Sequence, residues 1–145
     1  MPTTLGPAFP PDYRGLPTHM STEDSRIWTL FQPELQTRAT TLYFDVRLGG
    51  GQAVADAAGL PFADMWYRLN AKRADVLAVT PEYLELIELR YAAQPNAIGR
   101  LLTYDLLWSH DPALPGRLRL HLVTDHFDAD VLATAARYNI KYTVV

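Results

Sequence analysis

The sequence predicts an α/β sandwich with a mixed central sheet, preceded by a proline-rich arm. Apolar segments with the two-residue period of strands alternate with segments whose apolar residues recur at helical spacing. The expected order is helix, three strands, helix, strand, helix, strand. Three consecutive strands favour an antiparallel meander, and each later strand would join it in parallel through a helical crossover. The length of 145 residues suits one domain with a sizeable core.

Residues 1–20 are expected to form the arm, and residues 21–145 the folded domain. Proline and glycine recur through the arm, which excludes a helix or a central strand there. Phe9, Tyr13 and Leu16 are its candidate anchors. We expect the arm to lie on a surface, and self-assembly or a protein partner would supply one.

The first helix is expected to begin at Ser21, an N-cap residue followed by acids in the first turn. Pro33 either ends this helix or begins a second short one. Residues 40–48, rich in β-branched and aromatic side chains, predict a strand. The glycines at 49–51 lack the spacing and the lysine of a phosphate-binding loop, so they predict a turn. Residues 52–71 are expected to be an irregular, partly helical insertion.

Residues 74–90 read as two apolar strands joined by a short polar turn. The elements expected after this hairpin are a helix capped by Asn96, a strand at 118–124, a helix from Asp128 or Asp130 to Ala136, and a final strand at 140–145.

Composition excludes several classes of protein. The net charge of −3 argues against a protein that coats nucleic acid through positive charge alone. The absence of cysteine excludes disulfides, thiolate zinc sites and cysteine nucleophiles. No apolar run approaches a membrane span, and the first residues do not resemble a signal peptide. We therefore expect no membrane partner and a cytoplasmic protein, or a virion protein if the chain is encoded by a phage.

The hairpin carries the strongest candidate site. Glu88 and Arg90 are two residues apart, so they face the same side of their strand. Asp75 begins the preceding strand, and antiparallel pairing would bring all three residues to one edge of the sheet. Two carboxylates and a cation are the layout of a Mg²⁺ phosphodiesterase site. The same residues could instead form a surface ion pair worth less than about 1 kcal/mol, with Asp75 capping a turn.

The other polar residues are interpreted as structural. The acids between Asp125 and Asp130 lack the glycine and terminal glutamate of an EF-hand, so we assign them to a helix N-terminus. Glu82 and Glu85 are expected to be solvated. The scattered histidines, His121 among them, do not assemble into a Ser-His-Asp set. Aromatic residues at core-like spacing are expected to pack inside: Trp28, Trp66, Tyr104 and Trp108.

Three segments together resemble the PD-(D/E)XK superfamily, whose members have the restriction-endonuclease-like fold. The first is Asp75 with its apolar strand, followed by Ile87-Glu88-Leu89-Arg90 at the position of the family's E-x-K. The second is the helix Asn96-Ala97-Ile98-Gly99-Arg100-Leu101-Leu102-Thr103-Tyr104-Asp105. The third is the strand at 120–125 with its following helix and strand. The resemblance covers about residues 21–145.

The resemblance implies Mg²⁺-dependent cleavage of DNA phosphodiesters. Asp75 and Glu88 would hold the metal, with Glu34, or otherwise Glu23, as a third carboxylate. The cation two residues after the glutamate, here Arg90, would orient the attacking water and stabilise the transition state. Candidate DNA contacts nearby are Arg68, Lys72, Arg73 and Arg100.

The chain departs from the family's pattern at two positions. Arg90 stands where the family has lysine, and an arginine does not give up its proton at any working pH. Arg100 occupies a helix position that is often glutamine. Lys72, three residues before Asp75, is the candidate to replace the missing lysine in space. We therefore expect a degenerate nuclease-fold protein with weak or no activity, or a non-catalytic component of a phage virion or neck assembly.

Overall fold

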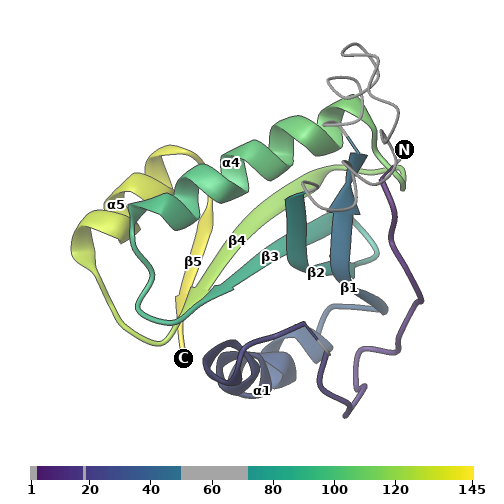
Figure 1. Cartoon of the computed structure of the whole chain (residues 1–145), viewed down its shortest axis with the longest axis horizontal. Helices are drawn as coiled ribbons and strands as arrows, with labels where there is room; N and C mark the ends of the chain where they lie inside the picture. The colour runs from purple at the N-terminus through teal and green to yellow at the C-terminus, as the bar shows by residue number, and fades with distance from the viewer. Residues whose placement is uncertain (1–2, 18, 50–71) are drawn as a thin grey trace, which may run out of the picture.

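The computed structural model describes residues 3–17, 19–49 and 72–145. The insertion expected at residues 52–71 lies outside the described residues, and so do its cation Arg68 and its aromatic Trp66. The described elements follow the predicted order (Figure 1): α1 (Thr22–Gln36), β1 (Thr41–Leu48), β2 (Lys72–Val79), β3 (Leu84–Arg90), α4 (Pro95–His110), β4 (Leu118–Thr124), α5 (Ala129–Arg137) and β5 (Lys141–Val144).

One mixed sheet connects the described strands in the order β1-β2-β3-β4-β5. The first three strands form an antiparallel meander, and β4 and β5 run parallel to β3. Each parallel strand is reached through a helix, α4 before β4 and α5 before β5, as a parallel connection requires. The predicted α/β class and the predicted change from antiparallel to parallel pairing are both confirmed.

Helices cover both faces of the sheet (Figure 1). Helix α1 lies on one face, and α4 and α5 lie together on the other. Trp28 and Phe31 of α1 pack on Ile87 and Leu89 of β3 in one apolar cluster. The opposite cluster joins α4 and α5 to the other face of the strands, with Tyr104 and Trp108 buried in it. Trp28, Tyr104 and Trp108 therefore serve as packing residues, as expected.

The helix ends agree with the sequence in two cases and differ in two. Ser21 caps α1 by accepting a hydrogen bond from the Asp24 N–H, and Asp128 caps α5. Helix α1 continues through Pro33, although that proline removes one backbone hydrogen bond, because the buried Phe31 and Leu35 hold this turn on the sheet. Helix α4 begins at Pro95, whose fixed φ favours the first turn of a helix, and its N-cap is Gln94, two residues before the expected cap Asn96.

The regular pairing of β1 with β2 is interrupted at one position, and the side chains of β1 change face there. Asp45 has φ of 52°, a left-handed conformation, and it stands opposite Asp75 without pairing to it. On one side of this point Phe44 packs toward α1, whereas on the other side Val46 packs toward α4. The irregularity leaves Asp75 outside the regular ladder between the two strands.

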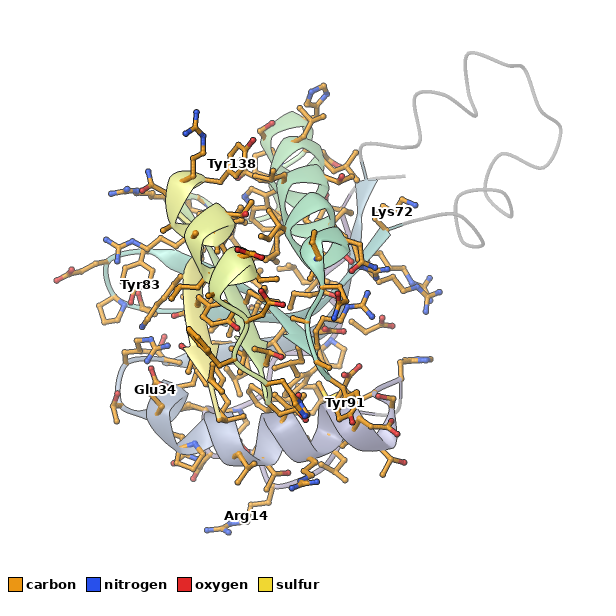
Figure 2. All side chains as sticks on the ribbon, turned by 90° about the vertical axis from the view of Figure 1, so that its left-hand side faces the viewer. Arg14, Glu34, Lys72, Tyr83, Tyr91 and Tyr138 are labelled. Atoms are coloured by element: carbon orange, nitrogen blue, oxygen red, sulfur yellow. The ribbon has the colours of Figure 1, made fainter. Side chains whose placement is uncertain are left out.

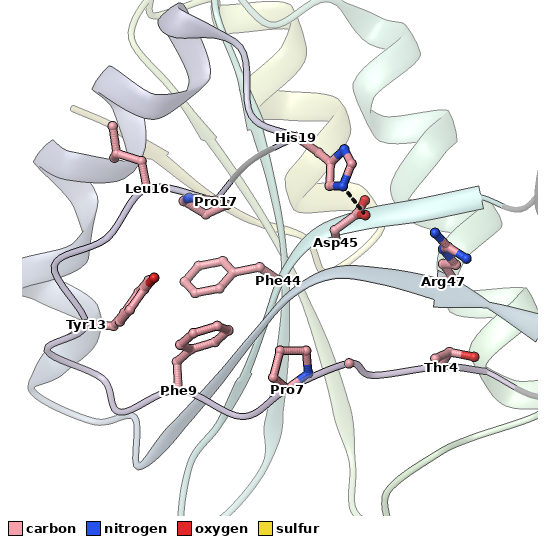
Figure 3. A pocket seen from close by; sticks show the side chains of 11 residues that line it. Thr4, Pro7, Phe9, Tyr13, Leu16, Pro17, His19, Phe44, Asp45 and Arg47 are labelled. Carbon is pink, nitrogen blue, oxygen red and sulfur yellow. Dashed lines mark ion pairs between the residues drawn. The ribbon is translucent and has the colours of Figure 1, made fainter.

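The arm lies on the edge strand β1 of its own chain. Thr4 bonds to Arg47 and Phe9 to Leu42 in antiparallel bridges. A cavity of about 290 Å³ lies between the arm and the strand. The rings of Phe9, Tyr13 and Phe44 meet in its wall (Figure 3). The anchors Phe9 and Tyr13 are confirmed, but Leu16 is 58% exposed and anchors nothing. The surface that orders the arm is therefore its own chain.

Candidate functional site

The β2–β3 hairpin brings Asp75 and Glu88 together where its two strands separate. Regular pairing runs as far as Val76 and Ile87, so Asp75 and Glu88 occupy the next position of the register. There the Asp75 Oδ2 atom accepts a hydrogen bond of 2.8 Å from the Leu89 N–H. A side chain thus takes the place of a backbone partner, and the two carboxylates lie at the opening between the strands.

Glu88 is buried, with 2% of its surface exposed, and two arginines contact one of its oxygens. The Nε atoms of Arg90 and Arg100 lie 3.1 Å and 3.4 Å from Oε1. The Arg100 Nε–H also donates to the Tyr104 hydroxyl at 3.2 Å. The second oxygen, Oε2, is buried and has no hydrogen-bond partner among the described residues. One carboxylate oxygen is therefore neutralised and the other is free to take a proton or a cation.

Burial and neighbouring carboxylates disfavour the charge on both acids, which raises their pKa values. Burial, together with the neighbouring Asp75 carboxylate, raises the pKa of Glu88 to about 8. Burial likewise raises the pKa of Asp75 to about 6, against the opposing hydrogen bond from Leu89. At neutral pH Glu88 carries a proton in much of the population. A divalent cation between the carboxylates would remove the repulsion and release that proton.

The acid that α1 contributes is Asp24, in its first turn. Its carboxylate raises the pKa of Asp75 and faces the Arg90 charge and the Tyr91 N–H, and burial raises its own pKa. Asp24 shares the helix face of Ile27, Trp28 and Phe31, all buried. That periodicity in the sequence could have identified it, whereas the neighbouring Glu23 is exposed.

Glu34, the third carboxylate expected from the resemblance, does not lie at the pair. It is ten residues beyond Asp24 on the same helix, a separation of about 15 Å. Its Oε1 contacts Arg38 Nη1 at 3.3 Å and Lys141 Nζ at 3.7 Å instead. Only the first turn of α1 reaches the opening of the hairpin, so Glu34, near the other end of this helix, is not the third carboxylate.

Of the predicted DNA-contacting cations, Arg100 is the one for which the described part of the chain shows an ion pair with the acid pair. Lys72 is exposed at the start of β2, opposite Leu48, and does not take the place of the missing lysine. Arg73 lies 3.4 Å from Asp45. Arg68 lies outside the described residues.

The donor set at the hairpin suits a hard cation held by few protein ligands. Among the described residues, no three His, Cys, Asp or Glu side chains gather closely enough to share an ion. Mg²⁺ does not require such a cage, because it binds through one or two carboxylates and keeps several waters. The unpaired Oε2 of Glu88, next to Asp75 in register, offers that minimal set.

A second polar cluster is buried on the α1 face of the sheet. Glu85, expected to be solvated, is 3% exposed, and Arg38 binds both of its oxygens at 2.9 Å and 2.8 Å. His121 Nδ1 lies 2.5 Å from Glu85 and His121 Nε2 lies 2.7 Å from Thr143 Oγ1. This cluster was not predictable from local sequence, because Arg38 and Glu85 are 47 positions apart in the chain.

The charges in this cluster are fixed. Burial opposes the charge on Glu85, but the hydrogen bonds from Arg38 and His121 outweigh it and lower the pKa of Glu85 to about 2. An ionised carboxylate only accepts, so His121 Nδ1 carries the proton and its Nε2 accepts from the Thr143 hydroxyl. Burial lowers the pKa of His121, which stays neutral. The order of hydroxyl, imidazole and carboxylate resembles that of a hydrolytic triad, but His121 is wholly buried.

The two clusters lie at different ends of the molecule. Figure 2 shows Glu34 and Tyr83 on one side, and Lys72 and Tyr91, which follows Arg90, on the other. No described helix is long and apolar enough to cross a membrane. In comparisons with known proteins, no family model, no curated protein and no solved structure matches this chain.

Proposed function

We propose that this chain is a degenerate member of the PD-(D/E)XK superfamily with the restriction-endonuclease-like fold. It acts on DNA, with weak or no Mg²⁺-dependent phosphodiesterase activity at Asp75 and Glu88. The observation that carries this proposal is the place of the two carboxylates. They face each other where β2 and β3 separate, and one buried oxygen of Glu88 has no partner.

Asp75 and Glu88 would hold the Mg²⁺ ion, which lowers the pKa of a bound water and neutralises charge on the phosphate. Arg90 and Arg100 lie beside them and are suited to bind phosphate oxygens through their planar guanidinium groups. Tyr104 orients Arg100 by accepting its Nε–H. These residues position a phosphodiester, but none of them replaces a lysine that could exchange a proton.

Competition for Glu88 accounts for the weak activity that we propose. The two guanidinium groups already stabilise one oxygen of Glu88, so the free energy of binding a metal ion there is less favourable than it would be at an unpaired carboxylate. The raised pKa of Glu88 adds a second barrier, because the proton must leave before the metal binds.

The test is cleavage of linear and circular DNA with Mg²⁺ or Mn²⁺. We expect activity near background for the wild type and higher activity for Arg90→Lys, which restores the cation of the family's pattern. Asp75→Ala or Glu88→Ala in the Arg90→Lys background should abolish the gain. Arg137→Lys is the matched control, because Arg137 is exposed in the last turn of α5, away from Asp75 and Glu88.

Two results would contradict this proposal. The first is an absence of both DNA binding and cleavage in the wild type and in Arg90→Lys. The second is cleavage that persists when Asp75 or Glu88 is replaced, since the activity would then come from another part of the chain or from a contaminant.

A non-catalytic scaffold is the second candidate. In that case the chain is a structural component of a phage virion or neck assembly, located in the virion, whereas a DNA-acting protein would be cytoplasmic. The ion pairs of Arg90 and Arg100 with Glu88 favour it, because they leave no full negative charge to attract a metal. Self-association through exchange of the arm would support this role. Sedimentation of the full chain, compared with Phe9→Ala, measures that exchange.

A further inference from the structure

A polar cavity of about 410 Å³ opens at the amino-terminal ends of β4 and β5, away from Asp75 and Glu88. It lies between the β2–β3 turn, the residues that lead into β4, and the connection from α5 to β5. Three cationic side chains line it: Arg117, Arg119 and Lys141. The whole chain has a net charge of −3, so this concentration of positive charge does not follow from a basic composition.

The carboxylates near this cavity leave its two arginines without an ion-pair partner among the described residues. Among residues 3–17, 19–49 and 72–145, no carboxylate oxygen lies within 4.0 Å of a nitrogen of Arg117 or Arg119. The one acid in the wall, Glu85, is already bound by Arg38 and His121. Lys141 contacts Glu34 at 3.7 Å, and that glutamate is shared with Arg38. The cavity is therefore positive at neutral pH.

The fold positions the Arg119 side chain and the Arg117 backbone. The Arg119 guanidinium carbon lies 4.1 Å from the centre of the Tyr83 ring, a stacking contact that fixes the plane of the group. The backbone of Arg117 is anchored because its carbonyl accepts the Leu84 N–H at 2.8 Å. Arg117 and Arg119 are two residues apart on an extended segment, so they point to the same side.

The remaining walls add a donor and a rigid floor. Asn139 lines the cavity from a left-handed turn with φ of 58°, where asparagine is among the few side chains tolerated. Beneath the cavity, the Arg38–Glu85–His121–Thr143 network connects the segment after α1 with β3, β4 and β5. Paired, planar arginines with a lysine and an amide are the donors that recognise a phosphate group.

We propose that this cavity binds a phosphate-bearing ligand, with Arg117 and Arg119 on the phosphate oxygens and Lys141 completing the charge. The volume admits a group as large as a nucleotide. The exposed face of the Arg119–Tyr83 stack would lie against a flat ring. This inference stands on residues distinct from Asp75 and Glu88, and it holds whether or not the chain cleaves DNA.

The experiment is an NMR titration of the full chain, following backbone amides. The probes are inorganic phosphate, adenosine 5′-monophosphate and a short single-stranded oligodeoxynucleotide. We expect chemical-shift changes at the amides of residues 117–121 and 139–141. The affinity measured from them should fall at least tenfold in the double variant Arg117→Gln/Arg119→Gln. Arg137→Gln, which removes an exposed arginine of α5 outside the cavity lining, should bind as the wild type does.

The three probes distinguish the source of the phosphate. Tighter binding of the mononucleotide assigns the cavity to a small ligand, and tighter binding of the oligonucleotide assigns it to nucleic acid. Lys141→Gln provides a second variant that leaves the Arg119–Tyr83 stack intact, and it should weaken binding severalfold. The proposal is overturned if no probe shifts these amides at millimolar concentration, or if the double variant and Arg137→Gln bind alike.

Discussion

Replacing Glu85 by glutamine removes the charge that Arg38 and His121 hold in the core. The pKa of Glu85 is about 2 in the folded protein, against an ordinary value of 4.5. The unfolded chain therefore binds this proton more readily, and folding is stabilised wherever the carboxylate is ionised. Converted by linkage, the difference corresponds to about 3 kcal/mol at pH 7. A similar loss is expected for breaking one partner of a buried ion pair.

The sign of the shift sets the pH window. The stabilisation is complete above pH 4.5 and is lost as the pH falls through about 2. The gap in unfolding free energy between wild type and Glu85→Gln should therefore be about 3 kcal/mol at pH 7 and less than half of that at pH 3. Burial also lowers the pKa of His121, so both proteins lose stability as the unfolded histidine takes up its proton in acid.

Urea denaturation at pH 7 and pH 3 measures both quantities. Glu82→Gln is the matched control, because Glu82 is exposed on the β2–β3 turn and its replacement should change stability little. A Glu85→Gln protein as stable as Glu82→Gln at pH 7 would refute the argument. So would a gap of the same size at both pH values, since that gap would reflect packing and not charge.

Three other perturbations have defined outcomes. Glu88→Gln should raise the melting temperature at pH 9 more than at pH 5. The pKa of Glu88 is about 8 in the folded protein and 4.5 in the unfolded chain, so the wild type loses stability as the pH rises between these values. Equal shifts of the melting temperature at both pH values would contradict this. Asp128→Ala should destabilise the protein by about 1 kcal/mol in urea, since the carboxylate caps two N–H groups of α5, whereas Asp130→Ala should have a smaller effect. Phe9→Ala should speed proteolysis of the arm, and unchanged cleavage would show that the ring contacts do not hold it.

Local pattern was enough to predict the elements of this fold. Alternating residues in β4, with Leu120 and Leu122 on one face and His121 on the other, gave both its bounds and its orientation. The proximity of Asp75 and Glu88, one position beyond the regular ladder, was also predictable, because a short hairpin fixes its register through its turn. The unpaired Oε2 of Glu88 was not predictable, since it depends on which oxygen of Glu88 the Arg100 side chain of α4 contacts.

Contacts between elements that are distant in sequence could not be predicted from the sequence alone. Glu85 looked solvated because nothing near it in sequence supplies a partner, and its partner Arg38 lies just after the end of α1. Tertiary pairing also decided between Asp24 and Glu34, because both lie on α1 but only its first turn faces the acid pair. The sequence could not show which end of the helix approaches the sheet opening.

Binding of Mn²⁺ to the full chain, followed by electron paramagnetic resonance, tests the central claim that Asp75 and Glu88 form one cation site. We expect one weakly bound ion per chain, with affinity rising as the pH passes about 8 and Glu88 loses its proton. Asp75→Asn and Glu88→Gln should each abolish it, and Glu34→Gln should leave it unchanged. Undetectable binding above pH 8, or binding that survives both replacements, would contradict the account.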